Sequence, residues 1–129
     1  MTGGLDSKQK AQLIVQAAQD KKAEDVIALD VRGISSFTDT FVIATGNSDR
    51  HVRSIVDGIE AALGQHGERP IGVEGREEGR WVLMDLNDAI VHVFQREARE
   101  HYGLERLWGD APELEIATLG PGVARSGAS

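Results

Sequence analysis

The chain of 129 residues contains no cysteine. This absence excludes a disulfide framework, a thiolate metal site and a cysteine nucleophile, and it suits a reducing compartment. No segment approaches the roughly 20 consecutive apolar residues that a membrane-crossing helix needs, and the N-terminus lacks the apolar core of a signal peptide. We therefore expect a soluble, cytoplasmic protein, long enough to bury a sizeable core in one domain.

Positive charge is also scarce. Lys and Arg number 14 against 21 Asp and Glu, which gives a formal net charge of −7. This balance argues against a protein that wraps nucleic acid unaided. It favours a basic partner, although acidity also serves plain solubility.

Hydrophobic spacing predicts an α/β protein with a single mixed β-sheet flanked by helices, in the order α-β-β-α-β-β-β-α. Helices are predicted from a cap at Ser7 to about Lys22, from a cap at Asn47 or Ser48 to between Gly64 and Gly67, and over Arg96–Tyr102. Strands are predicted over Asp25–Val31, Thr40–Thr45, Arg69–Val73, Trp81–Met84 and Ile90–Phe94, the last two joined as an antiparallel hairpin. The first of these strands is expected to be buried on both sides, and the third to lie at an edge.

Aromatic residues make up only 5% of the chain, and both tryptophans fall in one segment, Gly79–Asp110. Trp81 begins a strand directly after Glu-Glu-Gly-Arg, a position that favours partial exposure at a sheet edge and contact with a partner over a role as core. Tyr102 and Trp108 have two equal interpretations, because with Leu104 and Leu107 they could simply attach the last helix to the sheet. Arg96 and Arg99 are expected to balance the neighbouring Glu97 and Glu100.

An enzymatic interpretation starts from Gly46-Asn47-Ser48, because nucleotidyltransferases use such a strand-to-helix turn to receive phosphate on backbone N–H groups. That chemistry also needs paired carboxylates to hold a divalent metal. Asp85 and Asp88 flank a turn and project in different directions. His51 and His92 are solitary and favour structural roles. We therefore expect no catalytic residue, no metal and no cofactor.

Five motifs in order resemble the ribosomal silencing factor family, also called Iojap-like. They are LDV at Leu29–Val31, TDTFVIATGNSDRHV at Thr38–Val52, GVEG at Gly72–Gly75, WVLMDLNDAIVHVF at Trp81–Phe94 and YGLERLWGDA at Tyr102–Ala111. The resemblance covers about Leu13–Ala111 and assigns residues 1–111 to the family domain. Residues 112–129, rich in Gly, Pro and Ser, are predicted to be a disordered tail. At Asp85-Leu86-Asn87-Asp88 the chain departs from the family's usual Asp, aromatic, Gly, Asp, which leaves the type of this turn open.

The resemblance implies a fold related to the nucleotidyltransferases and a cytoplasmic factor that binds the large ribosomal subunit through its ribosomal protein number fourteen. Such a factor obstructs joining of the small subunit and represses translation under nutrient limitation. Homodimers are frequent in the family.

We predict a purely steric mechanism, with no covalent step, no membrane contact and no direct sequence-specific nucleic-acid binding. The predicted partner-binding residues are an apolar centre bordered by acids: Trp81, Val82, Met84, Asp85, Glu74, Tyr102, Leu104, Glu105 and Trp108. Acids around an apolar centre would speed encounter with a basic ribosomal protein and set its register. The alternatives are a dimeric adaptor that does not block ribosomes and, last, a nucleotide-binding transferase.

Overall fold

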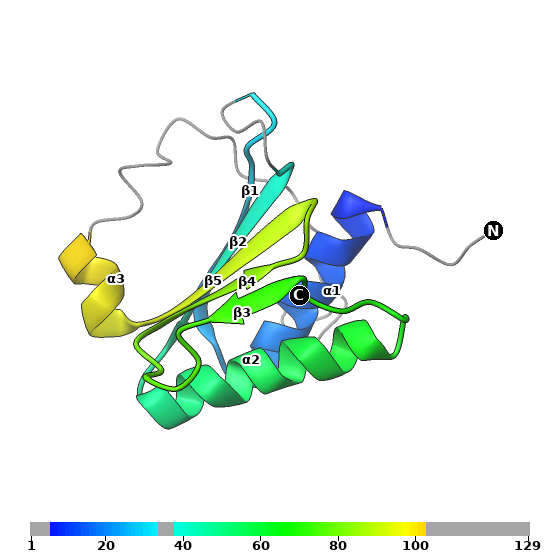
Figure 1. Ribbon diagram of the computed structural model, residues 1–129. Coiled ribbons are helices and arrows are strands. Elements are labelled where there is room, and N and C mark those ends of the chain that lie inside the picture. Colours follow the sequence, from blue (N-terminus) through cyan, green and yellow to red (C-terminus); the bar gives the residue numbers. More distant parts are fainter. Residues whose placement is uncertain (1–5, 34–37, 103–129) are drawn as a thin grey trace, which may run out of the picture.

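A computed structural model describes residues 6–33 and 38–102 of the chain (Figure 1). The elements are α1 (Ser7–Asp20), β1 (Glu24–Asp30), β2 (Thr40–Gly46), α2 (Asp49–Gly64), β3 (Gly72–Glu74), β4 (Trp81–Asp85), β5 (Ala89–Gln95) and α3 (Arg96–Tyr102). Their order is the predicted one, and the strands form one five-stranded sheet.

The strands lie in the order β1-β2-β5-β4-β3. β2 and β5 are parallel and every other neighbouring pair is antiparallel, so the predicted mixed sheet is confirmed. The β4–β5 hairpin closes tightly, because the N–H of Leu86 donates to the carbonyl of Ala89 at 2.9 Å. Asn87 has φ 77°, in the left-handed region that Asn tolerates and that tight hairpin turns use.

Both long helices begin with a side-chain cap. The cap of α1 is Asp6 and not the predicted Ser7: the Asp6 carboxylate accepts from the N–H of Gln9, whose side chain accepts from the N–H of Asp6. Ser48, one of the two predicted candidates, caps α2 by accepting from the N–H of His51 at 3.0 Å. The Asp6 carboxylate completes a reciprocal pair of hydrogen bonds with Gln9, which explains why it is the cap.

Helices α1 and α2 pack on the same side of the sheet, which we call the helix face (Figure 1). From the strands this face receives Val82, Met84, Val91 and Val93, all fully buried. From the helices it receives Ile14, Val52, Ile55, Val56, Ile59 and Leu63. This face therefore contains most of the hydrophobic core. Complete burial of one such aliphatic side chain contributes about 1.5–3 kcal/mol to stability.

The opposite side of the sheet carries the rings of Phe41, Trp81, His92 and Phe94, and we call it the aromatic face. Helix α3 packs at one end of it, where the fully buried Ala98 lies in a second apolar cluster with Ile43 and Phe94.

The two edges of the sheet differ in how well they were predicted. β3 is an edge strand, as its leading proline indicated, although it begins only at Gly72. β1 is the other edge. The expectation that the strand over Asp25–Val31 is buried on both sides holds only for Ala28, Leu29 and Val31, whereas Asp25, like Glu24 before it, is exposed. A bulge between Glu24 and Ile27 carries the start of the strand out of register with β2, which explains this exposure.

Candidate interaction surface

Four rings from three adjacent strands form one cluster on the aromatic face. The ring centroids of Trp81 and Phe94 lie 5.1 Å apart, and those of His92 and Phe94 lie 5.8 Å apart with nearly parallel planes. Phe41 meets His92 edge-on at 5.3 Å. Phe94 and His92 are buried, whereas Trp81 and Phe41 keep intermediate exposure. A rigid sheet therefore presents two partly exposed rings supported from below by two buried ones.

A hydrogen bond joins Trp81 to His92 across strands β4 and β5. The indole Nε1–H donates to Nδ1 of the imidazole at 3.1 Å. An indole nitrogen can only donate, so Nδ1 is unprotonated and the ring proton is on Nε2. Burial lowers the pKa of His92 to about 4, so the imidazole is neutral at pH 7. The structural role expected for His92 is consistent with this geometry.

Strand β4 lies between β5 and β3, so the expectation that Trp81 sits at a sheet edge is wrong. The predicted contact residues of this strand are divided between the two faces of the sheet. Trp81 and Asp85 point to the aromatic face together with Leu83, whereas Val82 and Met84 point to the helix face and are fully buried. The expectation that Val82 and Met84 share a contact surface with Trp81 is therefore wrong, because consecutive strand residues face opposite sides. Leu83, which keeps intermediate exposure, was missed. Counting in steps of two from Trp81 would have found it.

The two predicted acids that the structure describes lie on the same face as Trp81. Glu74 of β3 is exposed and stands directly opposite Leu83 in the strand register, which places both side chains on one side. Asp85 is partly buried, and its Oδ1 accepts from the N–H of Asn87 at 2.9 Å. Carboxylates thus border the Trp81 and Leu83 side chains toward β3 and toward the hairpin turn.

The segment that leads into Trp81 follows the sheet closely. Gly75 has φ +84°, and a Cβ at this position would lie 2.2 Å from the carbonyl oxygen of Trp81. Only glycine fits there without moving the backbone of β4. This requirement gives the GVEG motif at Gly72–Gly75 a local physical meaning.

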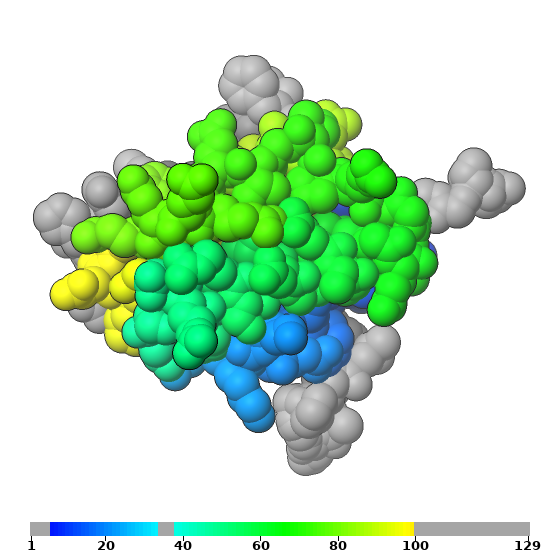
Figure 2. Space-filling model, turned by 60° about the horizontal axis from the view of Figure 1, so that its bottom comes forward, coloured from blue at the N-terminus to red at the C-terminus, as the bar shows by residue number. Residues whose placement is uncertain are grey.

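The same segment is anchored on α2. Arg53 of α2 donates to the carbonyl of Glu77 at 3.1 Å. Arg76 reaches back to Asp57 at 3.0 Å and to Glu60 at 2.6 Å. Figure 2 views the molecule from this side, with the green chain before β4 lying along α2. These contacts hold the entry to β4, and with it the position of Trp81.

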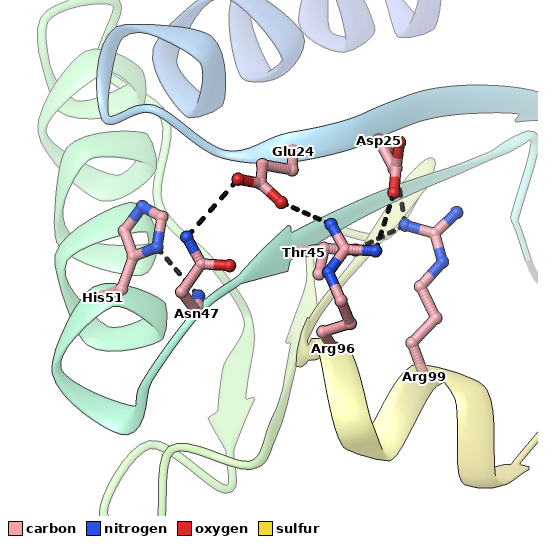
Figure 3. Close-up of polar contacts among 7 residues, drawn as sticks. All are labelled: Glu24, Asp25, Thr45, Asn47, His51, Arg96 and Arg99. Carbon is pink, nitrogen blue, oxygen red and sulfur yellow. Dashed lines mark hydrogen bonds and ion pairs between the residues drawn. The ribbon is translucent and has the colours of Figure 1, made fainter.

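Helix α3 is attached to the sheet by two arginines that reach across to β1 (Figure 3). Arg99 is buried and donates to Thr45 Oγ1 at 2.6 Å and to the carbonyl of Asp25 at 2.9 Å. Arg96 pairs with the carboxylates of Glu24 and Asp25, and its hydrogen bond lowers the pKa of Glu24. The expectation that these arginines balance Glu97 and Glu100 missed the partners on β1, which are far away in the sequence.

Polar groups of the turn at Gly46–Ser48 form hydrogen bonds with other residues of the chain. The N–H of Asn47 donates to Nδ1 of His51 at 2.9 Å, so the proton of this ring is on Nε2, which lies 2.8 Å from the carbonyl of Lys21. The Ser48 hydroxyl is occupied by capping α2. His51 thus bonds locally, as predicted, and it also links the end of α1 to the start of α2.

The carboxylates flanking the hairpin turn have separate partners. Asp85 caps the turn, whereas Asp88 lies 2.8 Å from the ammonium of Lys10, which is 6% exposed and also 3.2 Å from Glu68. Within residues 6–33 and 38–102, no group of three or more His, Asp or Glu side chains could hold a metal ion. In the same part of the chain, no helix is long and apolar enough to cross a membrane.

The remaining predicted contact residues belong to the end of α3 and beyond. Tyr102 is the last residue of α3. Leu104, Glu105 and Trp108 lie outside the described residues, so their part in a surface stays a prediction.

Comparison with known proteins decides the family. A family model described as "Ribosomal silencing factor during starvation" matches residues 5–128. The chain belongs to the ribosomal silencing factor family. It is 44% identical to the ribosomal silencing factor RsfS of Halalkalibacterium halodurans over 112 residues, which cover 87% of this chain and 96% of that relative. The predicted family is thereby confirmed.

Two further proteins are similar to this ribosomal silencing factor family member over most of its length. A crystal structure of a protein from Chromobacterium violaceum has a TM-score of 0.79 at 31% identity and covers 94% of this chain and 98% of that chain. A Mus musculus protein named "Mitochondrial assembly of ribosomal large subunit protein 1" is 28% identical over 99 residues, 74% of this chain and 43% of that protein. The family name implies a ribosome as partner and regulation of translation, whereas a relation of the fold to nucleotidyltransferases stays a prediction.

Proposed function

We propose that this protein binds the large ribosomal subunit in the cytoplasm and blocks its association with the small subunit, which represses translation under nutrient limitation. Membership of the ribosomal silencing factor family supports the ribosome as partner. The name of the mouse relative, which refers to assembly of the ribosomal large subunit, supports the choice of the large subunit. The proposed mechanism is steric: the bound protein occupies space that the small subunit needs.

The proposed contact is the part of the aromatic face around Trp81, with Leu83 beside it and Glu74 and Asp85 at its border. The observation that carries this choice is the position of Trp81, a partly exposed indole held on β4, inside the sheet, and supported by the buried Phe94. Large aromatic side chains on rigid supports dominate the energy of many protein interfaces.

The proposed occupant is a basic ribosomal protein, number fourteen of the large subunit. The chain has a net charge of −7, and two carboxylates border the apolar centre. Complementary charges of this kind raise the rate of encounter and fix the register, while the apolar centre supplies affinity. An interface of ordinary size buries roughly 1,600 Å² in total, which is far larger than the Trp81 side chain, so neighbouring residues must contribute.

The test is co-sedimentation of the protein with purified large subunits. Replacing Trp81 with Glu puts a charge in the centre of the contact, and loss of a central aromatic anchor typically costs about 2 kcal/mol or more, roughly thirtyfold in affinity. Ala61→Glu is the matched control, because Ala61 is exposed on α2, which covers the other face of the sheet. We expect Trp81→Glu to lose subunit binding and inhibition of subunit joining, and Ala61→Glu to keep both.

Two other results would contradict the proposal. If Trp81→Glu bound as well as the unchanged protein, Trp81 would not belong to the contact. If the unchanged protein never bound large subunits, the steric function itself would be wrong. Sedimentation of the protein alone, run in parallel, tests the homodimer that the family resemblance implies.

A further inference from the structure

We propose that His92 is a positioning residue: it holds the Trp81 indole in the orientation in which Trp81 meets the large ribosomal subunit. This inference rests on the proposed function and deepens it, because it assigns a role to a buried residue that cannot itself reach the partner. His92 is 5% exposed, whereas Trp81 keeps intermediate exposure.

The register of the sheet puts the two side chains within reach of each other. Trp81 stands opposite Phe94, and His92 stands opposite Leu83, so Trp81 and His92 are diagonal neighbours on the same face. At this spacing long and aromatic side chains of adjacent strands still touch. The ring centroids lie 6.1 Å apart, and the hydrogen bond between Nε1 and Nδ1 measures 3.1 Å.

The hydrogen bond selects one orientation of the indole. Packing of Trp81 on the flat ring of Phe94, with centroids 5.1 Å apart, is compatible with more than one rotation about the bond that carries the indole. Only a rotation that turns Nε1 toward His92 lets the indole N–H donate to Nδ1 of the imidazole. The other edge of the indole is then directed away from the imidazole.

The imidazole is itself held in place. Its ring is stacked on Phe94 at 5.8 Å with an interplanar angle of 7° and meets Phe41 edge-on at 5.3 Å. Because Nδ1 must remain an acceptor, only the neutral ring can serve. Burial favours that neutral form, and the pKa of His92 near 4 leaves the acceptor intact throughout the neutral pH range.

Preorganisation of this kind is expected to raise affinity by avoiding an ordering cost on binding. Immobilising one side chain that has several rotamers costs an amount of free energy equivalent to roughly threefold to tenfold in affinity. His92→Phe retains an aromatic ring and removes the acceptor. His92→Asn retains an acceptor close to the position of Nδ1. The pair therefore separates the hydrogen bond from simple packing.

The experiment measures two quantities on the full chain. The first is the indole N–H resonance of Trp81 in ¹⁵N-labelled protein, assigned by its loss in Trp81→Phe. The second is affinity for purified large subunits. We expect His92→Phe to move the resonance upfield and to weaken binding roughly threefold to tenfold, and His92→Asn to restore both toward their original values.

The control for effects of His92→Phe that do not act through the Trp81 indole is the same substitution made in a Trp81→Phe protein. There the indole donor is already gone, so adding His92→Phe should cause no further loss of affinity. Trp81→Phe alone does not test the inference, because it removes part of the contact together with the hydrogen bond. Because His92→Phe could perturb the core, recovery of binding in His92→Asn is the second test, since Asn restores an acceptor without restoring the imidazole ring.

The failure of this inference is distinct from the failure of the proposed contact. Unchanged subunit affinity in Trp81→Glu would reject the contact at Trp81. Weakened binding in Trp81→Glu combined with unchanged binding in His92→Phe would reject only the positioning role. Equal losses in His92→Phe and His92→Asn, or an indole resonance that does not move, would also overturn it.

Discussion

The two faces of the sheet are built from the same strands but differ in the burial and polarity of their side chains. On the helix face, Val82, Met84, Val91 and Val93 are completely buried against α1 and α2 and carry no polar side-chain atoms. On the aromatic face, rings of intermediate exposure lie beside a buried imidazole. Here α3 adds a buried guanidinium that binds Thr45. The difference teaches that one face supplies stability by bulk burial, whereas the other uses directional hydrogen bonds to fix the positions of particular side chains.

The largest expected difference between the two faces is the loss of stability when a charge is placed at either of two neighbouring residues of β4. Val82→Asp puts a carboxylate among aliphatic side chains, with a loss of unfolding free energy on the order of 4 kcal/mol or more. Leu83→Asp, one residue further on, keeps contact with water, and we expect a loss of about 1 kcal/mol. Urea denaturation measures both.

The same pair separates stability from function. We expect Leu83→Asp to remain folded and to bind large subunits less well. Equal destabilisation by the two substitutions would mean that the faces do not differ in the way described.

The pH dependence of stability is the next largest expected effect, and it belongs to the aromatic face. His92 has a folded pKa of about 4 against an ordinary value of 6.5, so between these values the unfolded chain binds a proton that the folded chain does not. The free energy of unfolding should therefore fall as the pH drops from 6.5 to 4, by about 3 kcal/mol in total. Urea denaturation at a series of pH values measures this slope.

His92→Phe cannot be protonated and serves as the reference. Both proteins contain the same carboxylates, so the difference between their pH profiles reports the protonation of His92 alone. Asp30, for example, has a pKa of about 2, so its effect on stability appears only in more acidic solutions. Parallel profiles over pH 4–6.5 would show that the imidazole is not buried as described.

The smallest expected effect compares two arginines of α3. Arg99→Lys should cost about 2 kcal/mol, because the buried hydrogen bonds to Thr45 and to the Asp25 carbonyl both come from the terminal Nη1, and a lysine ammonium ends one bond short of that position. Arg96→Lys should cost less, since its ion pairs with Glu24 and Asp25 are exposed to solvent.

Salt provides the check on this pair of arginines. Urea denaturation is measured at low and at high ionic strength. High ionic strength should remove the loss of stability caused by Arg96→Lys and leave most of the loss caused by Arg99→Lys. Equal costs, or equal sensitivity to salt, would mean that α3 is held by exposed ion pairs and not by the buried guanidinium.

The candidate surface was predictable in part. The exposure of Trp81 and the acids at its border follow from a strand that begins after a polar turn. Val82 and Met84 were wrongly included because their apolar character was read without the alternation of the strand. His92 was assigned a structural role, but its partner Trp81 lies on another strand, and only the β4–β5 register joins the two.

The sequence by itself determined the number, type and order of the elements and the family. Caps and apolar spacing act over a few residues, so the physical signals for the cap of α2 and for its apolar stripe are local. The tertiary structure alone decided the strand order, the face each ring occupies and the partners of Arg96 and Arg99. These features depend on contacts between residues that are distant along the chain, whose free energy exists only once the sheet has formed.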